Sequence, residues 1–354
     1  MKISQPLVFF SLLLLLTSCQ PRMLNVLCFG DSITQGRVKG DSITQLSYRF
    51  WLWEKLDSAG YKVDMLGSNN IWHKESRLKR VKVPVSQYTG HTFDTDHEGY
   101  YGIRTAEILD GGFTHDSVQY ASLHERLQKL EKPDVAFVHI GTNDSKGDSL
   151  KTITALKEIA EQIYFKNTKT TIFLAKLNTP WVRFVNHAVE PLMDELRMKY
   201  PKLKIRYVDM AAGWVNCTDV PGTMTYDWTH PNVLGQKTMA NNWYKAFKSI
   251  GDKQKPSFIA NTKVTAQTDS SVTITWTPAT DNKYIAGYNI RVNNEMVNWH
   301  RSECGSKEKQ CIALLTDNSL TLTNLKKGNE YKVTVSAVDF ANNVSVAKEI
   351  SFLK

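Results

Sequence analysis

The stretch Leu-Asn-Val-Leu-Cys-Phe-Gly-Asp-Ser-Ile-Thr-Gln-Gly, residues 24–36, decides the fold. Its first half is an apolar run with β-branched and aromatic members that ends at Gly30, which predicts a buried strand of a parallel sheet. Ser32 follows where this strand must turn, at the rim where open α/β sheets bind their ligands, so Ser32 is a candidate nucleophile. Asp and Ser also form turns and cap helices, and from this stretch alone that structural interpretation is the favoured one.

The pentapeptide Asp-Ser-Ile-Thr-Gln occurs at residues 31–35 and again at 41–45. Only the first copy follows a predicted strand. The second precedes a helical run, so we expect Ser42 or Thr44 to help start that helix and Ser32 to be the serine that matters.

Apolar strands alternate with longer amphipathic stretches as far as about Ile250. This alternation predicts βαβ units, and hence a parallel sheet with helices on both faces in a three-layer α/β/α domain. The predicted strands are Leu24–Phe29, Lys62–Leu66, Val135–Ile140, Thr171–Leu177 and Ile205–Val208. The predicted helices are Leu46–Ser58, Arg104–Leu109, Ser122–Leu130, Ser149–Phe165, Phe184–Tyr200 and Gly235–Ile250. Residues 69–99 lack a clear period and are expected to be a long insertion near a substrate entrance.

After Lys255-Pro256 the helical period disappears and short alternating runs predict an all-β domain over residues 256–354. Trp276 in an early strand, Tyr288, and Leu325 followed by Tyr331 at a strand-entry corner resemble a fibronectin type III sandwich. We expect it to be a spacer, or a scaffold that packs on the first domain.

The amino terminus has the features of a targeting segment. Residues 1–19 contain Lys2, an apolar core at Leu7–Leu16 that is too short to span a bilayer, and then Leu-Thr-Ser-Cys. The last four residues resemble the bacterial lipobox, which implies that Cys19 is lipidated and anchors the mature protein to a membrane. An ordinary secretory signal is the alternative. The expected location is that of an exported bacterial lipoprotein of the outer membrane, on its periplasmic face or at the cell surface.

Composition narrows the classes of partner. With 42% hydrophobic and 22% charged residues the chain is globular, and its net charge of +9 is spread along its length rather than gathered in one arm or helix. We therefore expect no nucleic-acid partner; the oligomeric state stays open. Cys304 and Cys311, seven apart in a polar stretch of an exported protein, are expected to form a disulfide or to be free thiols, and they lack the His partners of a metal site.

Two further stretches offer groups that stabilise an oxyanion. Ile140-Gly141-Thr142-Asn143-Asp144 ends a predicted strand at the same rim as Ser32, where the Asn143 amide can donate a hydrogen bond. In His97-Glu98-Gly99-Tyr100-Tyr101-Gly102, a glycine opening the helix around Arg104 can present a backbone N–H. Each stretch, taken alone, is also compatible with an ordinary turn or cap.

The last stretch is Tyr226-Asp227-Trp228-Thr229-His230-Pro231-Asn232. His230 is the natural general base, because imidazole can accept a serine proton near neutral pH. Asp227 can turn back to hydrogen-bond the other ring nitrogen. A lone Asp-x-x-His is also common in solvated loops.

Taken in chain order, the four blocks at residues 24–36, 97–102, 140–144 and 226–232 closely resemble the SGNH (GDSL-type) hydrolase family. The match covers about 225 residues, and we place this domain at residues 20–250. The resemblance implies that Ser32 is the nucleophile, His230 the base and Asp227 its partner, with no metal and no cofactor. It further implies an oxyanion hole of the Ser32 and Gly102 N–H groups and the Asn143 side chain. The second block departs from the family pattern with Tyr-Tyr before its Gly, so Gly99 is the alternative to Gly102.

Two stretches point to a branch within that family: Ser-Tyr-Arg-Phe-Trp-Leu-Trp at residues 47–53, after the nucleophile, and Tyr-Asp-Trp-Thr-His-Pro-Asn at residues 226–232. With them, the sequence looks like the branch of exported bacterial carbohydrate esterases. The implied function is removal of acetyl or other short acyl groups from a polysaccharide or oligosaccharide. Two alternatives are a lipid-directed esterase (lysophospholipase or thioesterase) and a non-catalytic surface glycan-binding lipoprotein. Four residues with aromatic or charged side chains on or near the predicted rim loops are candidates for substrate binding: Trp181, Arg183, Tyr226 and Trp228. Burial in the core or packing in a loop is about as frequent for such residues.

Overall fold

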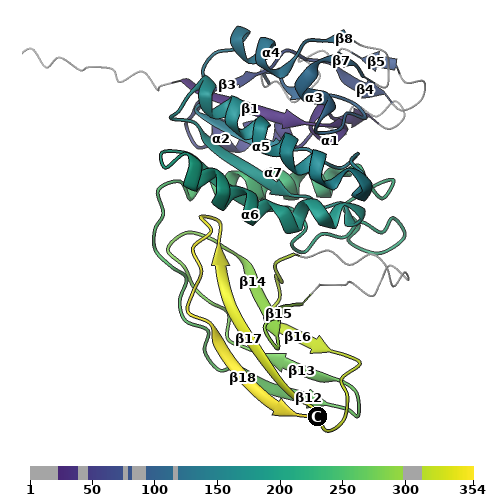
Figure 1. Ribbon diagram of the computed structural model, residues 1–354, viewed down its shortest axis with the longest axis vertical. Coiled ribbons are helices and arrows are strands. Elements are labelled where there is room, and N and C mark those ends of the chain that lie inside the picture. The colour runs from purple at the N-terminus through teal and green to yellow at the C-terminus, as the bar shows by residue number, and fades with distance from the viewer. Residues whose placement is uncertain (1–22, 39–46, 75–78, 82–92, 115–118, 298–312) are drawn as a thin grey trace, which may run out of the picture.

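The computed structural model of the chain describes residues 23–38, 47–74, 79–81, 93–114, 119–297 and 313–354. Within these residues a three-layer α/β/α domain is followed by a sandwich of antiparallel sheets, which lies below it in Figure 1. This architecture confirms the predicted fold class. The predictions for Cys19, for the repeat at residues 41–45 and for Cys304 and Cys311 concern positions outside the described residues.

The parallel sheet of the first domain has the strand order β3-β1-β9-β10-β11. Its strands are β1 (Met23–Gly30), β3 (Lys62–Leu66), β9 (Val135–His139), β10 (Thr171–Lys176) and β11 (Lys204–Asp209). Numbered along the chain, the order is 2-1-3-4-5, so the direction of winding reverses between β1 and β9. A crevice forms at the carboxyl ends of the strands at such a reversal, and this is where the loops that follow β1 and β9 meet.

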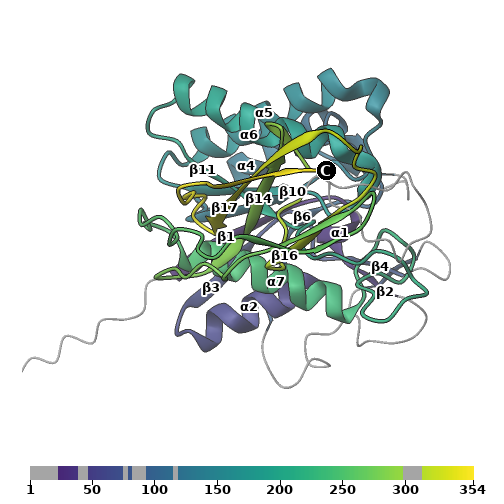
Figure 2. The ribbon, with the colours of Figure 1, turned by 90° about the horizontal axis from the view of Figure 1, so that it is seen from below.

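Helices cover both faces of this sheet. Figure 2 shows α4, α5 and α6 on one face and α2 and α7 on the other, as the alternation of strands and helices predicted. The helices are α1 (Ser32–Gln35), α2 (Tyr48–Ser58), α3 (Glu107–Asp110), α4 (Leu123–Lys129), α5 (Ser149–Lys166), α6 (Arg183–Lys199) and α7 (Val233–Lys248), with 3-10 turns at Lys146–Asp148 and Pro180–Val182.

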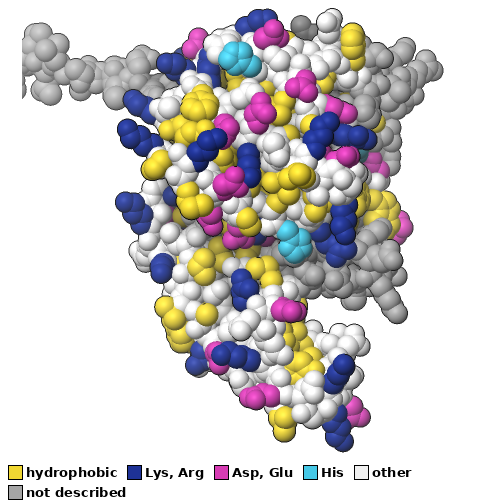
Figure 3. All heavy atoms as spheres, viewed as in Figure 1, with side chains coloured by type: hydrophobic (Ala, Val, Ile, Leu, Met, Phe, Trp, Pro, Cys, Tyr) yellow, Lys and Arg dark blue, Asp and Glu magenta, His cyan; other side chains and the backbone are white. Residues whose placement is uncertain are grey.

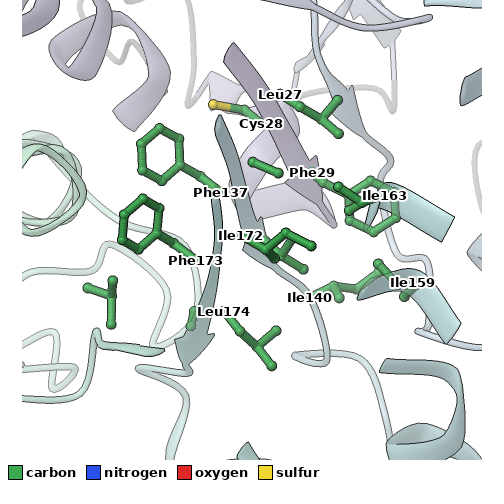
Figure 4. Packing of buried hydrophobic residues seen from close by; sticks show 14 of the residues in the cluster. Leu27, Cys28, Phe29, Phe137, Ile140, Ile159, Ile163, Ile172, Phe173 and Leu174 are labelled. Carbon is green, nitrogen blue, oxygen red and sulfur yellow. The ribbon is translucent and has the colours of Figure 1, made fainter. Parts of the chain in front are cut away.

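Burial on both sides explains why β1 is a nearly continuous apolar run. Successive side chains of a strand point to opposite faces, and in Figure 4 Cys28 projects to one side while Leu27 and Phe29 project to the other. All three are fully buried. On the Cys28 side, Phe137 and Phe173 from the next two strands stack with their ring centroids 5.4 Å apart. The sheet is thus a rigid base for the loops at its carboxyl edge.

Short strands that the sequence did not predict lie around the insertion. They are β2 (Arg37–Val38), β4 (Trp72–Lys74), β5 (Lys79–Val81), β6 (Glu98–Gly99), β7 (Gly112–Phe113) and β8 (Gln119–Tyr120). Strand β6 extends the main sheet by pairing with the end of β1, Gly30 opposite Gly99. The end of the insertion is therefore held directly beside the turn that carries Ser32.

The sandwich has the strand arrangement of a fibronectin type III domain. One sheet contains β12 (Lys263–Gln267), β13 (Val272–Thr275) and β16 (Ser319–Leu322), and the other contains β14 (Ile285–Val292), β15 (Glu295–Met296), β17 (Glu330–Asp339) and β18 (Lys348–Leu353). Buried Trp276 packs edge-on against Tyr288. The Tyr331 hydroxyl accepts a hydrogen bond from the backbone N–H of Lys326 at 2.8 Å, which is the tyrosine corner that the sequence indicated.

Side chains tie the sandwich to strand β11, the edge of the parallel sheet. The Asn342 amide accepts from the backbone N–H of Tyr207 at 2.9 Å and donates to its carbonyl at 3.0 Å. Asp209, the last residue of β11, accepts a hydrogen bond from the backbone N–H of Leu314 at 2.8 Å. The sandwich is therefore docked on the first domain.

The described residues contain no helix that is long and apolar enough to cross a bilayer. On the face shown in Figure 3, Lys and Arg side chains are interspersed with Asp and Glu over both domains. Of the two described cysteines, Cys28 is free and buried, and burial raises the pKa of its thiol to about 12. Cys217 is disulfide-bonded, with its partner outside the described residues.

Candidate active site

Three side chains from distant parts of the chain form a continuous hydrogen-bonded row. Ser32 is the first residue of α1, directly after β1, and its Oγ lies 2.9 Å from Nε2 of His230. The other ring nitrogen of His230, Nδ1, lies 2.7 Å from Oδ2 of Asp227. The structure thus brings together the three residues that the sequence assigned as nucleophile, base and acid. The row has the connectivity of a catalytic triad.

The turn that exposes Ser32 is built by its neighbours. Asp31 caps α1, and its Oδ1 accepts a hydrogen bond from the backbone N–H of Ile33 at 3.0 Å. Asp31 is fully buried, and burial raises the pKa of its carboxyl. Gly30 admits no side chain, because a Cβ there would lie 2.1 Å from the His139 carbonyl oxygen of β9. The strand, the glycine and the capped turn together fix the position of the serine.

Asp227 is held by its own loop as well as by the imidazole. Its Oδ1 accepts from the backbone N–H groups of Thr229 at 3.1 Å and His230 at 2.7 Å. Burial favours the neutral acid, but the hydrogen bonds from His230 outweigh it and lower the pKa of Asp227 to about 2. The carboxylate is therefore ionised at neutral pH, which favours the tautomer with the proton on Nδ1. In that tautomer Nε2 carries no proton and can accept the one from the serine hydroxyl.

The loop around His230 is tightly closed. Trp228 has a φ of 70°, a left-handed backbone conformation that allows Asp227 to reach back to His230. The Tyr226 ring stacks on the imidazole, with the ring centroids 5.9 Å apart and an interplanar angle of 17°. His230 is only 9% exposed, so its ring is confined by the loop and the stack.

The three predicted oxyanion donors follow three strands that end at the same rim. The backbone N–H groups of Ser32, after β1, and Gly102, after β6, find no acceptor among the described residues. Asn143, after β9, uses its side-chain Nδ2 to donate to the Ile103 carbonyl at 3.0 Å, which leaves a second N–H on the same nitrogen. Three N–H donors are thus present in the loops at this rim, and donors of this kind are what a developing oxyanion needs.

The structure favours Gly102 over Gly99 in the second block. The N–H of Gly99 already donates to Nδ1 of buried His97 at 3.0 Å, and Gly99 lies within β6. Gly102 has a φ of 71° in the turn that follows. One correction concerns the local structure: helix α3 begins at Glu107, so Gly102 presents its N–H from a turn rather than from the start of a helix.

Two positioning residues were missed by the sequence reasoning. Asp144 accepts hydrogen bonds from the hydroxyl of Thr105 at 2.7 Å and from its backbone N–H at 3.1 Å. A third bond, from the Thr152 hydroxyl at 2.9 Å, fixes the same carboxylate to α5. Asp144 thereby ties the turn of Asn143 to the turn of Gly102. The adjacent Asn-Asp pair was visible in the sequence, but nothing there identified Thr105 as its partner.

Of the candidate substrate contacts, Trp181 is the most informative. Its indole N–H donates to the carbonyl of Thr142, next to Asn143, at 3.1 Å, and 48% of the residue is exposed. Tyr226 and Trp228 are partly buried in the histidine loop, and Arg183 is the first residue of α6. The structure thus places a half-exposed aromatic side chain beside the oxyanion loop, the turn at residues 141–144 that carries Asn143.

Among the described residues, one group of acidic side chains has a geometry that could hold a metal ion: Asp252, Asp281 and Asp339. None of them belongs to the triad. His139, which the sequence predicted to be a core residue, is fully buried, and its Nε2 lies 3.2 Å from Oδ1 of Asn178.

Comparison with known proteins gives two family matches. Residues 26–243 match the model of the GDSL-like lipase/acylhydrolase family, and residues 254–347 match the fibronectin type III domain. Chitinase A1 of Niallia circulans is 32% identical over 104 residues, which are 29% of this chain and 13% of the chitinase. The chain therefore spans a small part of that relative.

Solved structures of carbohydrate esterases match the chain at low sequence identity. A carbohydrate esterase of family 3 from Talaromyces cellulolyticus is 23% identical, with a TM-score of 0.48, and the match covers 64% of this chain and 98% of the esterase. A family 3 carbohydrate esterase from Clostridium thermocellum is also 23% identical, with a TM-score of 0.44 and coverage of 63% and 94%.

Proposed function

Since the chain belongs to the GDSL-like lipase/acylhydrolase family, we propose that it is a serine esterase that removes acetyl or other short acyl groups from a polysaccharide. The observation that carries this proposal is the hydrogen-bonded row from Ser32 through His230 to ionised Asp227. The row ends at a rim where N–H donors are available to an oxyanion.

In the proposed reaction, Ser32 Oγ attacks the ester carbonyl carbon while Nε2 of His230 takes the hydroxyl proton. The carbonyl oxygen becomes an oxyanion and accepts hydrogen bonds from Ser32 N–H, Gly102 N–H and Asn143 Nδ2. When the tetrahedral intermediate collapses, the sugar oxygen leaves with the proton from His230 and the acyl group stays on Ser32. Water then repeats the sequence and releases the carboxylic acid.

Asp227 contributes orientation and charge. Its Oδ1 holds the loop backbone and its Oδ2 bonds Nδ1 of the imidazole, so the ring cannot turn away from Ser32 without breaking that bond. The negative carboxylate also stabilises the imidazolium that forms in each half-reaction.

Support for a carbohydrate substrate comes from the open face of Trp181. Its N–H is fixed to the oxyanion loop, so its ring has a defined orientation, and aromatic faces of this kind pack well against the C–H faces of sugars. A short acyl group suits a nucleophile that is only 4% exposed.

A substrate panel tests the proposal. Acetate release from acetylated xylan or pectin is measured beside fatty-acid release from lysophosphatidylcholine. We expect acetate release, its loss in Ser32→Ala, and full activity in the matched control Ser145→Ala, which alters an exposed serine near Asn143. Preferred release of fatty acid would identify a lipid-directed esterase instead. Sugar binding without turnover on any ester would identify a glycan-binding protein.

We also propose that Cys19 carries lipid and holds the protein at the outer membrane. Incorporation of labelled palmitate in the wild-type protein, but not in Cys19→Ser, would support this location. Release of unlabelled wild-type protein into the soluble exported fraction would contradict it.

A further inference from the structure

Three aspartates from separate segments meet at the junction of the two domains. Asp252 follows α7 at the end of the catalytic domain, Asp281 lies between β13 and β14, and Asp339 is the last residue of β17. One carboxylate oxygen of each lies within 4.8 Å of those of the other two. Asp281 and Asp339 both belong to the sandwich, so domain docking accounts for the approach of Asp252 to these two.

Two of these carboxylates have an oxygen without a hydrogen-bond donor. In Asp252, Oδ1 accepts from Gln254 N at 3.0 Å and from Asn282 Nδ2 at 3.2 Å, while Oδ2 is buried and accepts none. In Asp281, Oδ2 accepts from Lys283 N at 2.8 Å, while Oδ1 is buried and accepts none. These two oxygens are an observation independent of the clustering itself.

The third carboxylate, Asp339, is 1% exposed. It accepts from the backbone N–H groups of Ala341 and Asn343, each at 2.8 Å, and from the Asn343 side chain at 2.7 Å. Burial raises its pKa most, and the negative charge of Asp281 raises it further. The junction therefore holds one buried carboxylate next to the partly buried Asp252 and Asp281.

Protein cations do not neutralise this charge by direct contact. No Lys or Arg in the described ranges forms an ion pair with Asp252, Asp281 or Asp339. Arg206 interacts electrostatically with Asp339 and Asp252, but its guanidinium donates a hydrogen bond to the carbonyl of Ser249, at 2.8 Å, rather than to either carboxylate. Buried carboxylate oxygens without a donor are costly unless a bound cation compensates them.

Calcium suits this group of ligands. It binds carboxylate oxygens at 2.3–2.6 Å in flexible geometry, so two oxygens on one ion lie at most about 5 Å apart, and the bound of 4.8 Å falls within that span. Water and backbone carbonyls commonly complete the six to eight ligands that calcium takes.

We propose that Asp252, Asp281 and Asp339 form a calcium site that joins the end of α7 to the sandwich. The ion has no part in ester hydrolysis. It stabilises the docked arrangement by binding to residues of both domains, which are brought together only in the folded chain.

Thermal unfolding of the EDTA-treated full-length protein tests the site, with isothermal calorimetry as a second readout. Calcium sites of extracellular modules have Kd values of roughly 10⁻⁴–10⁻³ M, so calcium at ten times Kd should raise Tm by about 3–6 °C. Asp281→Asn should abolish this shift and raise Tm in the absence of calcium, because it removes one of the repelling charges. Asp252→Asn should also abolish the shift.

The matched control is Asp269→Asn, an exposed aspartate in the turn between β12 and β13, which should keep the full calcium shift. Equal shifts in Asp281→Asn and wild type, or no shift and no binding heat in wild type, would overturn the proposal. A shift of the same size with magnesium would overturn the assignment to calcium. Ester hydrolysis by the folded enzyme should be equal with and without calcium, so this test is independent of the esterase proposal.

Discussion

Replacing Asn143 with Ala tests the oxyanion site directly. The side-chain Nδ2 donates one hydrogen bond to Ile103, at 3.0 Å, and its second N–H is the one assigned to the oxyanion. Loss of a single donor of this kind typically lowers kcat by about 100–1,000-fold, or ~2.7–4 kcal/mol. Because the bond strengthens in the transition state, KM should change little while kcat falls.

The same substitution has a small structural cost. It removes the bond to Ile103, worth about 1 kcal/mol, which corresponds to a Tm decrease of about 2–4 °C in a domain of this size. The bonds between Asp144 and Thr105 stay in place and keep the two turns together. The variant should therefore be folded at assay temperature, and unfolding cannot account for a hundredfold loss of activity.

The assay is steady-state hydrolysis of p-nitrophenyl acetate, with Tm measured on the same samples. Asn241→Ala, on helix α7, is the matched control and should retain wild-type kcat. A kcat for Asn143→Ala within about threefold of wild type, in a folded sample, would refute the assignment of Asn143 as a donor. A tenfold rise in KM at unchanged kcat would mean that Asn143 binds substrate and transition state equally.

Three further outcomes are expected. Folding lowers the pKa of Asp227 from 3.8 to about 2, so its charge stabilises the protein above about pH 4, and this stability is lost as the pH falls toward 2. The Tm difference between wild type and Asp227→Asn should therefore shrink between pH 4 and pH 2. A constant Tm difference over that range would contradict the pKa shift. Asn342→Gly can adopt the left-handed backbone but loses both hydrogen bonds to Tyr207, so its free energy of unfolding in chemical denaturation should fall by about 1–3 kcal/mol. Asn342→Ala should be less stable still, because the φ of 67° at this position strains an alanine. Equal stability of the Gly and Ala variants would argue against this backbone strain. Trp181→Ala should raise KM for acetylated xylan about tenfold. Trp181→Phe keeps an aromatic ring but loses the hydrogen bond to Thr142, so its KM should rise less. An unchanged KM in both variants would mean that Trp181 does not contact the substrate.

The strands and long helices were predictable because their side chains carry a clear period. Strand β3 has the predicted bounds, and β1, β10 and α5 end within one residue of them, since burial on both sheet faces makes each strand a distinct apolar run. The residues of the triad row were found because each lies in a short motif after a strand or before a helix. Ser32 and His230 are 198 residues apart, however, and only the family resemblance indicated that they meet.

Contacts between distant polar side chains were not predictable. The pairing of Asp144 with Thr105 has no sequence period, because it depends on the path of two loops. The turn at Gly102 was assigned to a helix start because glycine serves both structures. The cluster around Asp339 combines residues from both domains, so it exists only once the sandwich has docked.

The docking of the sandwich also changes the fate of strand β11. An edge strand presents unpaired N–H and C=O groups to any passing chain, and natural proteins cover or disrupt such edges to avoid aggregation. Here the Asn342 amide occupies both the N–H and the C=O of Tyr207, much as the backbone of a neighbouring strand would. The sandwich thus acts as an edge cover for the catalytic sheet. A catalytic domain without the sandwich would expose the edge of β11. Its molecules would then tend to associate through that edge, even if the active site itself were intact.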